Sequence, residues 1–169
     1  MLPARFLSGL AAAASLLLPL AALLAAAPAR ADCVPRQFPP DWLQQQEKAG
    51  GHTIEYNVAK PDSFLIERLQ ADEGIPYAST FPDEQTATAA IEAALKASAA
   101  HIALWLGRAK NGQALALEAK AGSPIGRLAV RPVGASNIRP ATSLILVLKK
   151  LADDRCVLLN AYPSAGPQQ

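Results

Sequence analysis

The chain has 169 residues, a length that suits one domain, and 51% of them are hydrophobic. Its formal charge of +2 comes from the first 31 residues, because residues 32–169 hold 14 basic and 14 acidic side chains. This composition excludes a uniformly basic nucleic-acid coat, a charged disordered tail and, with two cysteines, a disulfide-rich scaffold. A basic face on one part of the surface stays compatible with it.

Residues 1–31 are typical of a bacterial secretory signal peptide. Arg5 supplies the positive start, residues 7–27 are mostly Leu and Ala, and Ala-Arg-Ala at 29–31 offers small residues for cleavage. An uncleaved membrane anchor is the alternative, since about 20 apolar residues can span a bilayer. The cleavage site favours a signal peptide, so we expect a periplasmic or secreted protein that begins at Asp32 and has no membrane attachment.

Two cysteines remain in the mature chain: Cys33 at its N-terminus and Cys156 in the last apolar segment. Lone cysteines tend to pair in an oxidising compartment, and this pair would close a loop of about 120 residues. We expect a disulfide; two independent thiols, with Cys156 buried in a strand, are the alternative. Neither cysteine has a His or second Cys at metal-ligand spacing, so we expect no metal site and no cofactor.

The first half of the mature chain predicts helices. Residues 32–49 form a proline-containing extension, with a short helix that starts near Asp41 and ends before a Gly-Gly pair. A second helix starts at Pro61, where Asp62 can cap it. Residues 83–106 predict one long helix, because apolar residues recur at three- and four-residue steps on an Ala-rich background.

The second half predicts strands. Residues 115–120 alternate in polarity, 125–133 follow a Gly-Ser-Pro turn, 142–149 are a continuous apolar run, and 155–162 form the last strand. Residues 164–169 are expected to be a flexible tail. Helices followed by strands predict an α+β fold, with N-terminal helices packed on a twisted antiparallel sheet.

Basic residues concentrate in the strand half. Residues 32–100 hold 5 basic and 11 acidic side chains, whereas residues 101–150 hold 8 basic ones and a single acidic one, Glu118. A basic sheet face could bind a polyanion such as RNA. Solvated strand edges, where lysine also discourages aggregation, explain the same pattern, and charge alone leaves both interpretations open.

Two histidines are candidates for proton transfer near neutral pH. His101 lies within the predicted long helix and is expected to be a surface or half-buried residue there. His52 follows Gly50 and Gly51 at a junction between elements, where functional residues often gather. The sequence contains no Gly-x-Ser-x-Gly, Gly-x-Gly-x-x-Gly, Walker or His-Glu-x-x-His motif, so a serine hydrolase or a nucleotide-binding protein has no support.

Several short motifs follow one another in a set order. They are Gly-Gly-His-Thr-Ile at 50–54, Lys-Pro-Asp at 60–62, Gly-Arg at 126–127 and Asn-Ala-Tyr-Pro at 160–163. Together they resemble the bacterial RNase A-like toxin domain found at the C-termini of contact-dependent growth inhibition proteins and other polymorphic toxins. The resemblance covers residues 50–163 and implies an RNase A-like α+β fold for them.

The resemblance also implies metal-free RNA cleavage, in which the ribose 2′-hydroxyl attacks the adjacent phosphate and leaves a 2′,3′-cyclic phosphate. It implies His52 as the base, and a cation on the following helix, Arg68 or as runner-up Lys60, facing the phosphate. Tyr162 matches a tyrosine whose hydroxyl points into the cleft. Asn160 stands where the family usually has threonine; its amide can donate to a phosphate oxygen but cannot relay a proton, so Tyr162 or water is the expected acid.

An exported ribonuclease, acting on RNA as an antibacterial effector, is therefore the first hypothesis. We expect Lys60, Arg127 and Lys149 to bind substrate, and we expect a monomer with a cognate immunity protein as a further partner. Because of Asn160, a catalytically weakened periplasmic binding module with the same fold is the alternative. An immunity-like decoy that binds a related toxin is a third interpretation.

Overall fold

The computed structural model describes residues 33–134, 137–152 and 155–166. The predicted signal peptide at 1–31 and the mature start at Asp32 lie outside these residues. The described elements, in chain order, are α1 (Trp42–Lys48), α2 (Thr53–Asn57), α3 (Asp62–Ala71), β1 (Tyr77–Thr80), α4 (Glu84–Ala97), α5 (Ala99–Leu106), β2 (Ala114–Lys120), β3 (Gly126–Val130), β4 (Ile138–Ala141), β5 (Ser143–Lys150) and β6 (Cys156–Ser164).

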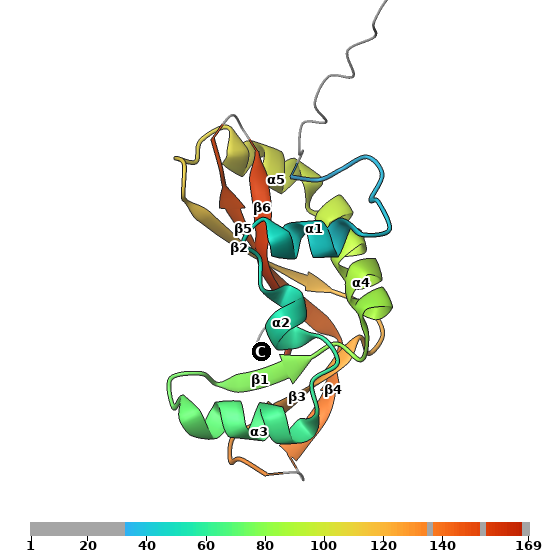
Figure 1. The fold of residues 1–169 in the computed structure, drawn as a ribbon, viewed down its shortest axis with the longest axis vertical. Helices are drawn as coiled ribbons and strands as arrows, with labels where there is room; N and C mark the ends of the chain where they lie inside the picture. The colour runs from blue at the N-terminus through green and yellow to red at the C-terminus, as the bar shows by residue number, and fades with distance from the viewer. Residues whose placement is uncertain (1–32, 135–136, 153–154, 167–169) are drawn as a thin grey trace, which may run out of the picture.

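The strands form two three-stranded antiparallel sheets, ordered β1-β3-β4 and β2-β5-β6. The predicted α+β class with antiparallel strands is confirmed, although the strands divide between two sheets instead of one. Figure 1 shows the two halves that result: β2, β5 and β6 lie with α1, α4 and α5, whereas β1, β3 and β4 lie with α3. Helix α2 lies between the halves.

Each half has its own apolar core. Leu65 and Leu69 of α3 are fully buried against Ala78 of β1 and Ala129 of β3. In the larger core, the buried face of α4 packs on the β2-β5-β6 sheet and the segments around it. The largest fully buried side chains of this core are Leu43, Phe81, Ile91, Leu95, Ile102, Leu144, Leu146, Leu148 and Leu158. Each such side chain contributes about 1.5–3 kcal/mol through burial.

The predicted helix at 83–106 is two helices, α4 and α5, which meet at Ser98 with a bend of 68°. Sequence periodicity did not reveal the break, because strong helix formers lie on both sides of it. No described helix alone is long and apolar enough to cross a membrane, and α4 with α5 meets that test only across the bend. His101 is exposed on α5, as predicted.

The predicted cap at Asp62 is wrong. The residue before α3 is Pro61, no side chain caps this helix, and Asp62 is its first residue. Its carboxylate instead accepts a hydrogen bond from Arg127 Nε at 2.5 Å. Asp62 therefore ties α3 to β3 rather than closing its own helix.

The last strand is longer than predicted. β6 extends to Ser164, which is 1% exposed, so the predicted tail at 164–169 begins too early. Residues 167–169 lie outside the described part of the chain. The short elements α2, β1 and β4 were not predicted, because four or five residues carry too little periodicity to identify a helix or strand.

One edge of β6 pairs with β5, and a segment running from α1 to α2 meets the other edge. Backbone groups on this outer edge bond to side chains or backbone of residues 46–57. The hydrogen bonds are Leu158 N to Gln46 Oε1 at 2.9 Å, His52 N to Leu159 O at 3.0 Å, Ala161 N to Thr53 Oγ1 at 2.9 Å and Asn57 Nδ2 to Ala161 O at 3.1 Å. They hold α2 against β6.

The predicted disulfide is confirmed: Cys33 and Cys156 are bonded, with their Cα atoms 5.2 Å apart. Both cysteines are 7% exposed and belong to the larger core. The bridge fastens the N-terminal extension to the first residue of β6 and spans 123 residues of chain. A cross-link of this span stabilises the fold mainly by restricting the unfolded chain.

Replacing both cysteines by serine should lower the free energy of unfolding by about 2–5 kcal/mol. Urea denaturation of the oxidised protein and of the Cys33→Ser/Cys156→Ser variant measures the difference. A reducing agent should lower the midpoint of the unsubstituted protein and leave that of the variant unchanged. Equal midpoints for the oxidised protein and the variant would contradict this account.

Candidate active site

His52 lies at the junction of α1 and α2, where its backbone N–H donates to the Leu159 carbonyl of β6. Two glycines make this close approach possible. Gly50 has a φ of 103°, in the region that favours glycine. A Cβ on Gly51 would lie 2.6 Å from the Leu158 carbonyl oxygen. The Gly-Gly pair therefore sets His52 directly beside β6.

Helix α2 is short and is fastened at its N-terminus by Glu47 from α1. The two carboxylate oxygens accept hydrogen bonds from Ile54 N at 3.0 Å and from Glu55 N at 2.8 Å. These amides have no partner within the helix, and a carboxylate is favoured at this positive end. Glu47 thus fixes the turn that carries His52.

Tyr56 stands between His52 and Arg68. Its ring lies edge-on to the imidazole, with centroids 5.8 Å apart. The Arg68 Cζ atom lies 5.9 Å from the same tyrosine centroid, at the distance of a cation–π contact. The tyrosine ring therefore brings a histidine from the start of α2 and a cation from α3 to one wall.

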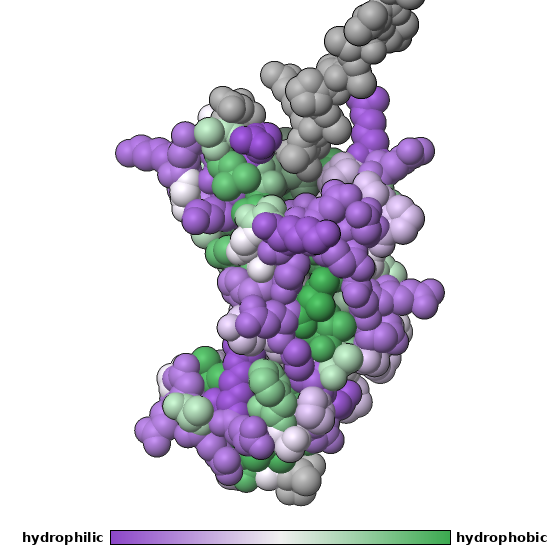
Figure 2. Space-filling view, viewed as in Figure 1, coloured by the Kyte–Doolittle hydropathy of each residue, from purple (hydrophilic) through white to green (hydrophobic). Residues whose placement is uncertain are grey.

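Two adjoining pockets form a cleft at this wall. One holds about 460 Å³ and is lined by His52, Tyr56, Phe64, Glu67, Arg68, Ala71 and Asn160. The other holds about 240 Å³ and is lined by Asn57, Arg68, Ile75, Pro76, Tyr77, Ala78, Ser79, Asn160 and Tyr162. Arg68 and Asn160 line both pockets. The surface is hollowed where the two halves of the molecule meet, and hydrophilic residues dominate this face (Figure 2).

The four residues predicted to be catalytic therefore line one cleft: His52, Arg68, Asn160 and Tyr162. Of the two candidate cations, Arg68 lines the cleft and Lys60 does not. Arg68 and His52 are its basic groups, and Glu67 on the same wall is a carboxylate. A phosphate would be favoured on the side of Arg68 and Asn160, away from Glu67.

Asn57 connects these groups from behind the cleft. It is 1% exposed, and its Oδ1 accepts a hydrogen bond from Arg68 Nη1 at 3.3 Å. Its Nδ2 donates to Asn160 Oδ1 at 2.7 Å and to the Ala161 carbonyl at 3.1 Å. One buried amide thus bonds to a guanidinium from α3 and to two residues of β6.

Tyr77 and Tyr162 close the far end of the cleft, with ring centroids 6.4 Å apart. Burial raises the pKa of Tyr77 to about 12, and Tyr162 and Glu118 add to the rise. Burial also raises the pKa of Tyr162, against the lowering effect of Arg68. Both phenols therefore keep their protons at neutral pH and can donate hydrogen bonds.

The predicted substrate-binding residues lie outside the two pockets. The Lys60 Nζ lies 5.6 Å from the ring centroid of Phe64, a residue that lines the 460 Å³ pocket. Arg127 bonds to Asp62 and to the Lys60 carbonyl. Lys149 is half-buried on β5. Contact of these three residues with substrate stays a prediction.

The basic strand half does not form a single free basic face. Arg131 donates to the carbonyls of Leu69 and Asp72, and the nearly buried Lys150 donates to the Leu106 carbonyl. Arg127, Arg131 and Lys150 therefore all donate hydrogen bonds to oxygen atoms of the protein itself. The concentration of positive charge seen in the sequence therefore serves, in part, to join strands to neighbouring elements.

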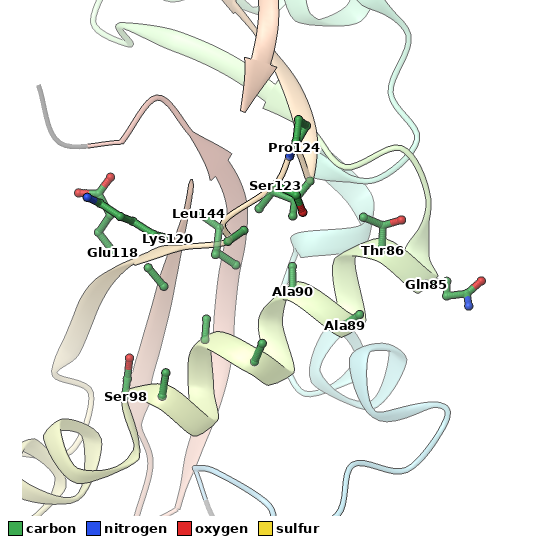
Figure 3. A pocket seen from close by; sticks show the side chains of 16 residues that line it. Gln85, Thr86, Ala89, Ala90, Ser98, Glu118, Lys120, Ser123, Pro124 and Leu144 are labelled. Atoms are coloured by element: carbon green, nitrogen blue, oxygen red, sulfur yellow. The ribbon is translucent and has the colours of Figure 1, made fainter. Parts of the chain in front are cut away.

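A larger pocket of about 790 Å³ lies between α4 and strand β2. Alanine side chains of α4 form much of its wall, opposite Lys120, Ser123 and Pro124 (Figure 3). It holds no histidine or tyrosine and one cation, Lys120. Its lining offers far less acid–base chemistry than the cleft at His52. Within the described ranges, no group of three or more His, Cys, Asp or Glu could hold a metal ion.

Sequence reasoning missed three residues of the cleft: Tyr56, Asn57 and Tyr77. Tyr56 and Asn57 lie on an unpredicted helix and Tyr77 on an unpredicted strand. Asn57 lies five residues after His52, but its partner Asn160 is 103 residues further along the chain. Only the fold brings these two amides together.

Comparison with known proteins identifies the family of this chain. The family model of the bacterial CdiA-CT RNase A domain matches residues 51–163, more than half of the chain. A chain in the crystal structure of a CdiA-CT/CdiI complex from Y. kristensenii matches with a TM-score of 0.59 and 25% identity, over 68% of this chain and 99% of that one. No curated protein matches the sequence. The resemblance stated from the motifs is confirmed, and the chain belongs to the bacterial CdiA-CT RNase A domain family.

Proposed function

We propose that the protein is an exported ribonuclease that cleaves RNA without a metal ion. The observation that carries the proposal is the convergence of His52, Arg68, Asn160 and Tyr162 on one cleft from three separate elements. They supply a base, a cation, an amide donor and a hydroxyl. These are the groups that transfer of an RNA phosphate to its own 2′-oxygen requires.

His52 acts as the base. Its imidazole takes the proton of a ribose 2′-hydroxyl, and the 2′-oxygen forms a bond to the adjacent phosphorus while the bond to the 5′-oxygen breaks. The departing 5′-oxygen takes a proton from Tyr162 or from water. The products are a 2′,3′-cyclic phosphate and a free 5′-hydroxyl, and the raised pKa of Tyr162 keeps its phenol protonated for this step.

Arg68 and Asn160 stabilise the charge that grows on the phosphate oxygens. Because the two residues line both pockets, a phosphate placed between the pockets meets the guanidinium and the amide together. Fixed donors of this kind act where charge develops, and removing one costs about 10²–10³-fold in rate. A neutral amide adds a donor without adding positive charge.

Cleavage of a defined RNA in EDTA tests the proposal. The oxidised protein beginning at Asp32 should release fragments with a 2′,3′-cyclic phosphate, and a 2′-deoxyribose at the cleavage position should block the reaction there. His52→Ala should lower the rate by at least about 100-fold, because it removes the base. His101→Ala is the matched control, because His101 is exposed on α5 and does not line the cleft. This variant should cleave at the normal rate.

Two outcomes would overturn the proposal. A folded protein that leaves RNA intact would favour a binding module that keeps the fold without the activity. Cleavage that disappears in EDTA and returns with a divalent metal would contradict the metal-free mechanism.

We also propose that the protein is exported through its N-terminal signal. The signal-like residues 1–31 and the disulfide between Cys33 and Cys156 support this, because disulfides persist in oxidising compartments. Expressed in a bacterium with its own leader, the protein should appear in the periplasm or the medium with the mass of residues 32–169. Intact residues 1–31 on a membrane-bound product would contradict export by cleavage.

An antibacterial role and an inhibitor protein complete the proposal. The similar chain from Y. kristensenii is part of a CdiA-CT/CdiI complex. We propose that this chain, too, has a cognate immunity protein, whose addition at equal concentration would stop the cleavage of RNA. An enzyme that cleaves RNA could damage a competing cell, and it would equally damage the cell that makes it unless an inhibitor protein binds it there.

A further inference from the structure

We propose that Asn57 is a positioning residue that turns the amide of Asn160 so that its Nδ2 group faces the cleft. The inference rests on the proposed function, because it assigns the neutral donor that meets the RNA phosphate. It concerns a buried residue that touches no substrate itself. Asn57 acts mainly through the side chain of Asn160, to which it is bonded.

The orientation of the Asn57 amide is fixed by partners that allow no choice. Its Nδ2 lies 3.1 Å from the Ala161 carbonyl, which can only accept. Its Oδ1 lies 3.3 Å from Arg68 Nη1, which can only donate. Turning the amide over would set donor against donor and acceptor against acceptor in a site where Asn57 is 1% exposed.

The orientation of the Asn160 amide follows from that of Asn57. The Nδ2 of Asn57 can only donate, and it lies 2.7 Å from the Asn160 side chain, so Asn160 must turn its Oδ1 inward. The Nδ2 of Asn160 is then the arm of the planar amide that points away from Asn57 Nδ2. Within the described part of the chain, no hydrogen bond uses that Nδ2, and Asn160 lines both pockets of the cleft.

The arrangement suits an anion. Two N–H groups of Asn160 and the remaining N–H groups of Arg68 are available to one phosphate, and Asn57 holds both side chains at fixed positions. Preorganised donors stabilise developing charge without the cost of reorienting during the reaction. A threonine at position 160 would likewise accept from Asn57 and donate its hydroxyl outward.

Amide hydrogen exchange in the unsubstituted protein tests the orientation directly. By nuclear magnetic resonance, the side-chain amide protons of Asn57 should exchange slowly, because they are buried and bonded, and those of Asn160 should exchange rapidly. Equal protection of both amides, or protection of Asn160 alone, would overturn the proposal. This result does not depend on whether the protein cleaves RNA.

Asn57→Asp tests the consequence for the reaction. An aspartate has no donor for Asn160 Oδ1, so the Asn160 amide should turn its Nδ2 inward and present an oxygen to the phosphate. We expect kcat/KM for RNA to fall at least about 100-fold, mostly through kcat. Asn111→Asp, the same change at an exposed residue, is the matched control and should cleave normally.

A double-substitution cycle separates positioning from a merely structural role. In an Asn160→Ala background, the effect of Asn57→Asp should be at least about tenfold smaller, because only its contact with Arg68 remains. The same large factor in both backgrounds would overturn the proposal. Cleavage by the unsubstituted protein together with normal cleavage by folded Asn57→Asp would overturn it as well, while leaving the proposed function intact.

If Asn57→Asp does not fold, substitutions at position 160 decide the matter. Asn160→Asp keeps an acceptor for Asn57 Nδ2, but it replaces the outward amide by a carboxylate oxygen and adds a negative charge, so it should lose at least about 100-fold in kcat/KM. Asn160→Thr should recover most of that loss, since its hydroxyl donates outward. Cleavage by Asn160→Asp at the normal rate would overturn the proposal.

Discussion

The outer edge of β6 is the constraint on which the site depends. An unpaired strand edge exposes backbone donors and acceptors, and this one is met by side-chain and backbone groups between Gln46 and Asn57 instead of by another strand. Satisfying that edge docks α2 against β6 and sets His52 in the same pocket as Asn160 of β6. The Gly-Gly pair is needed because a Cβ at Gly51 would collide with the strand.

The same strand joins the two halves of the molecule. Tyr162 of β6 faces Tyr77 of β1, and Asn57, bonded to β6, holds Arg68 of α3. The first contact joins the half that contains α4 to the half that contains α3. The second joins α2, which lies between the halves, to α3 (Figure 1). The cleft is therefore shaped by side-chain contacts between two separately packed cores, and their relative placement governs how closely the base and the cation can approach one phosphate.

The sequence predicted the fold class and the longer elements better than the short elements and the division into two sheets. Helix α3 and strands β5 and β6 have strong apolar patterns, and the α+β class followed from their order. The break at Ser98 and the short elements α2, β1 and β4 have no pattern strong enough to identify them. Their existence depends on tertiary contacts, such as the bonds between α2 and β6.

The residues of the candidate site could likewise be predicted only in part. His52, Arg68 and Tyr162 could be named because they lie in motifs, whereas Asn57 could not, since its role comes from a partner 103 residues away. The strongly basic strand half suggested a polyanion-binding face, yet Arg127, Arg131 and Lys150 bond to oxygens of the protein. Net charge in a sequence does not distinguish a cation that faces solvent from one that joins two elements.

We propose that RNA binds in the cleft between α2, α3 and β6. The most direct measurement is a nuclear magnetic resonance titration of the mature protein with a dinucleotide that has a 2′-deoxyribose and so cannot be cleaved. The account predicts shifts in the side-chain signals of His52, Arg68, Asn160 and Tyr162. Shifts confined to the alanines of α4 and to Lys120, in the larger pocket, would contradict it.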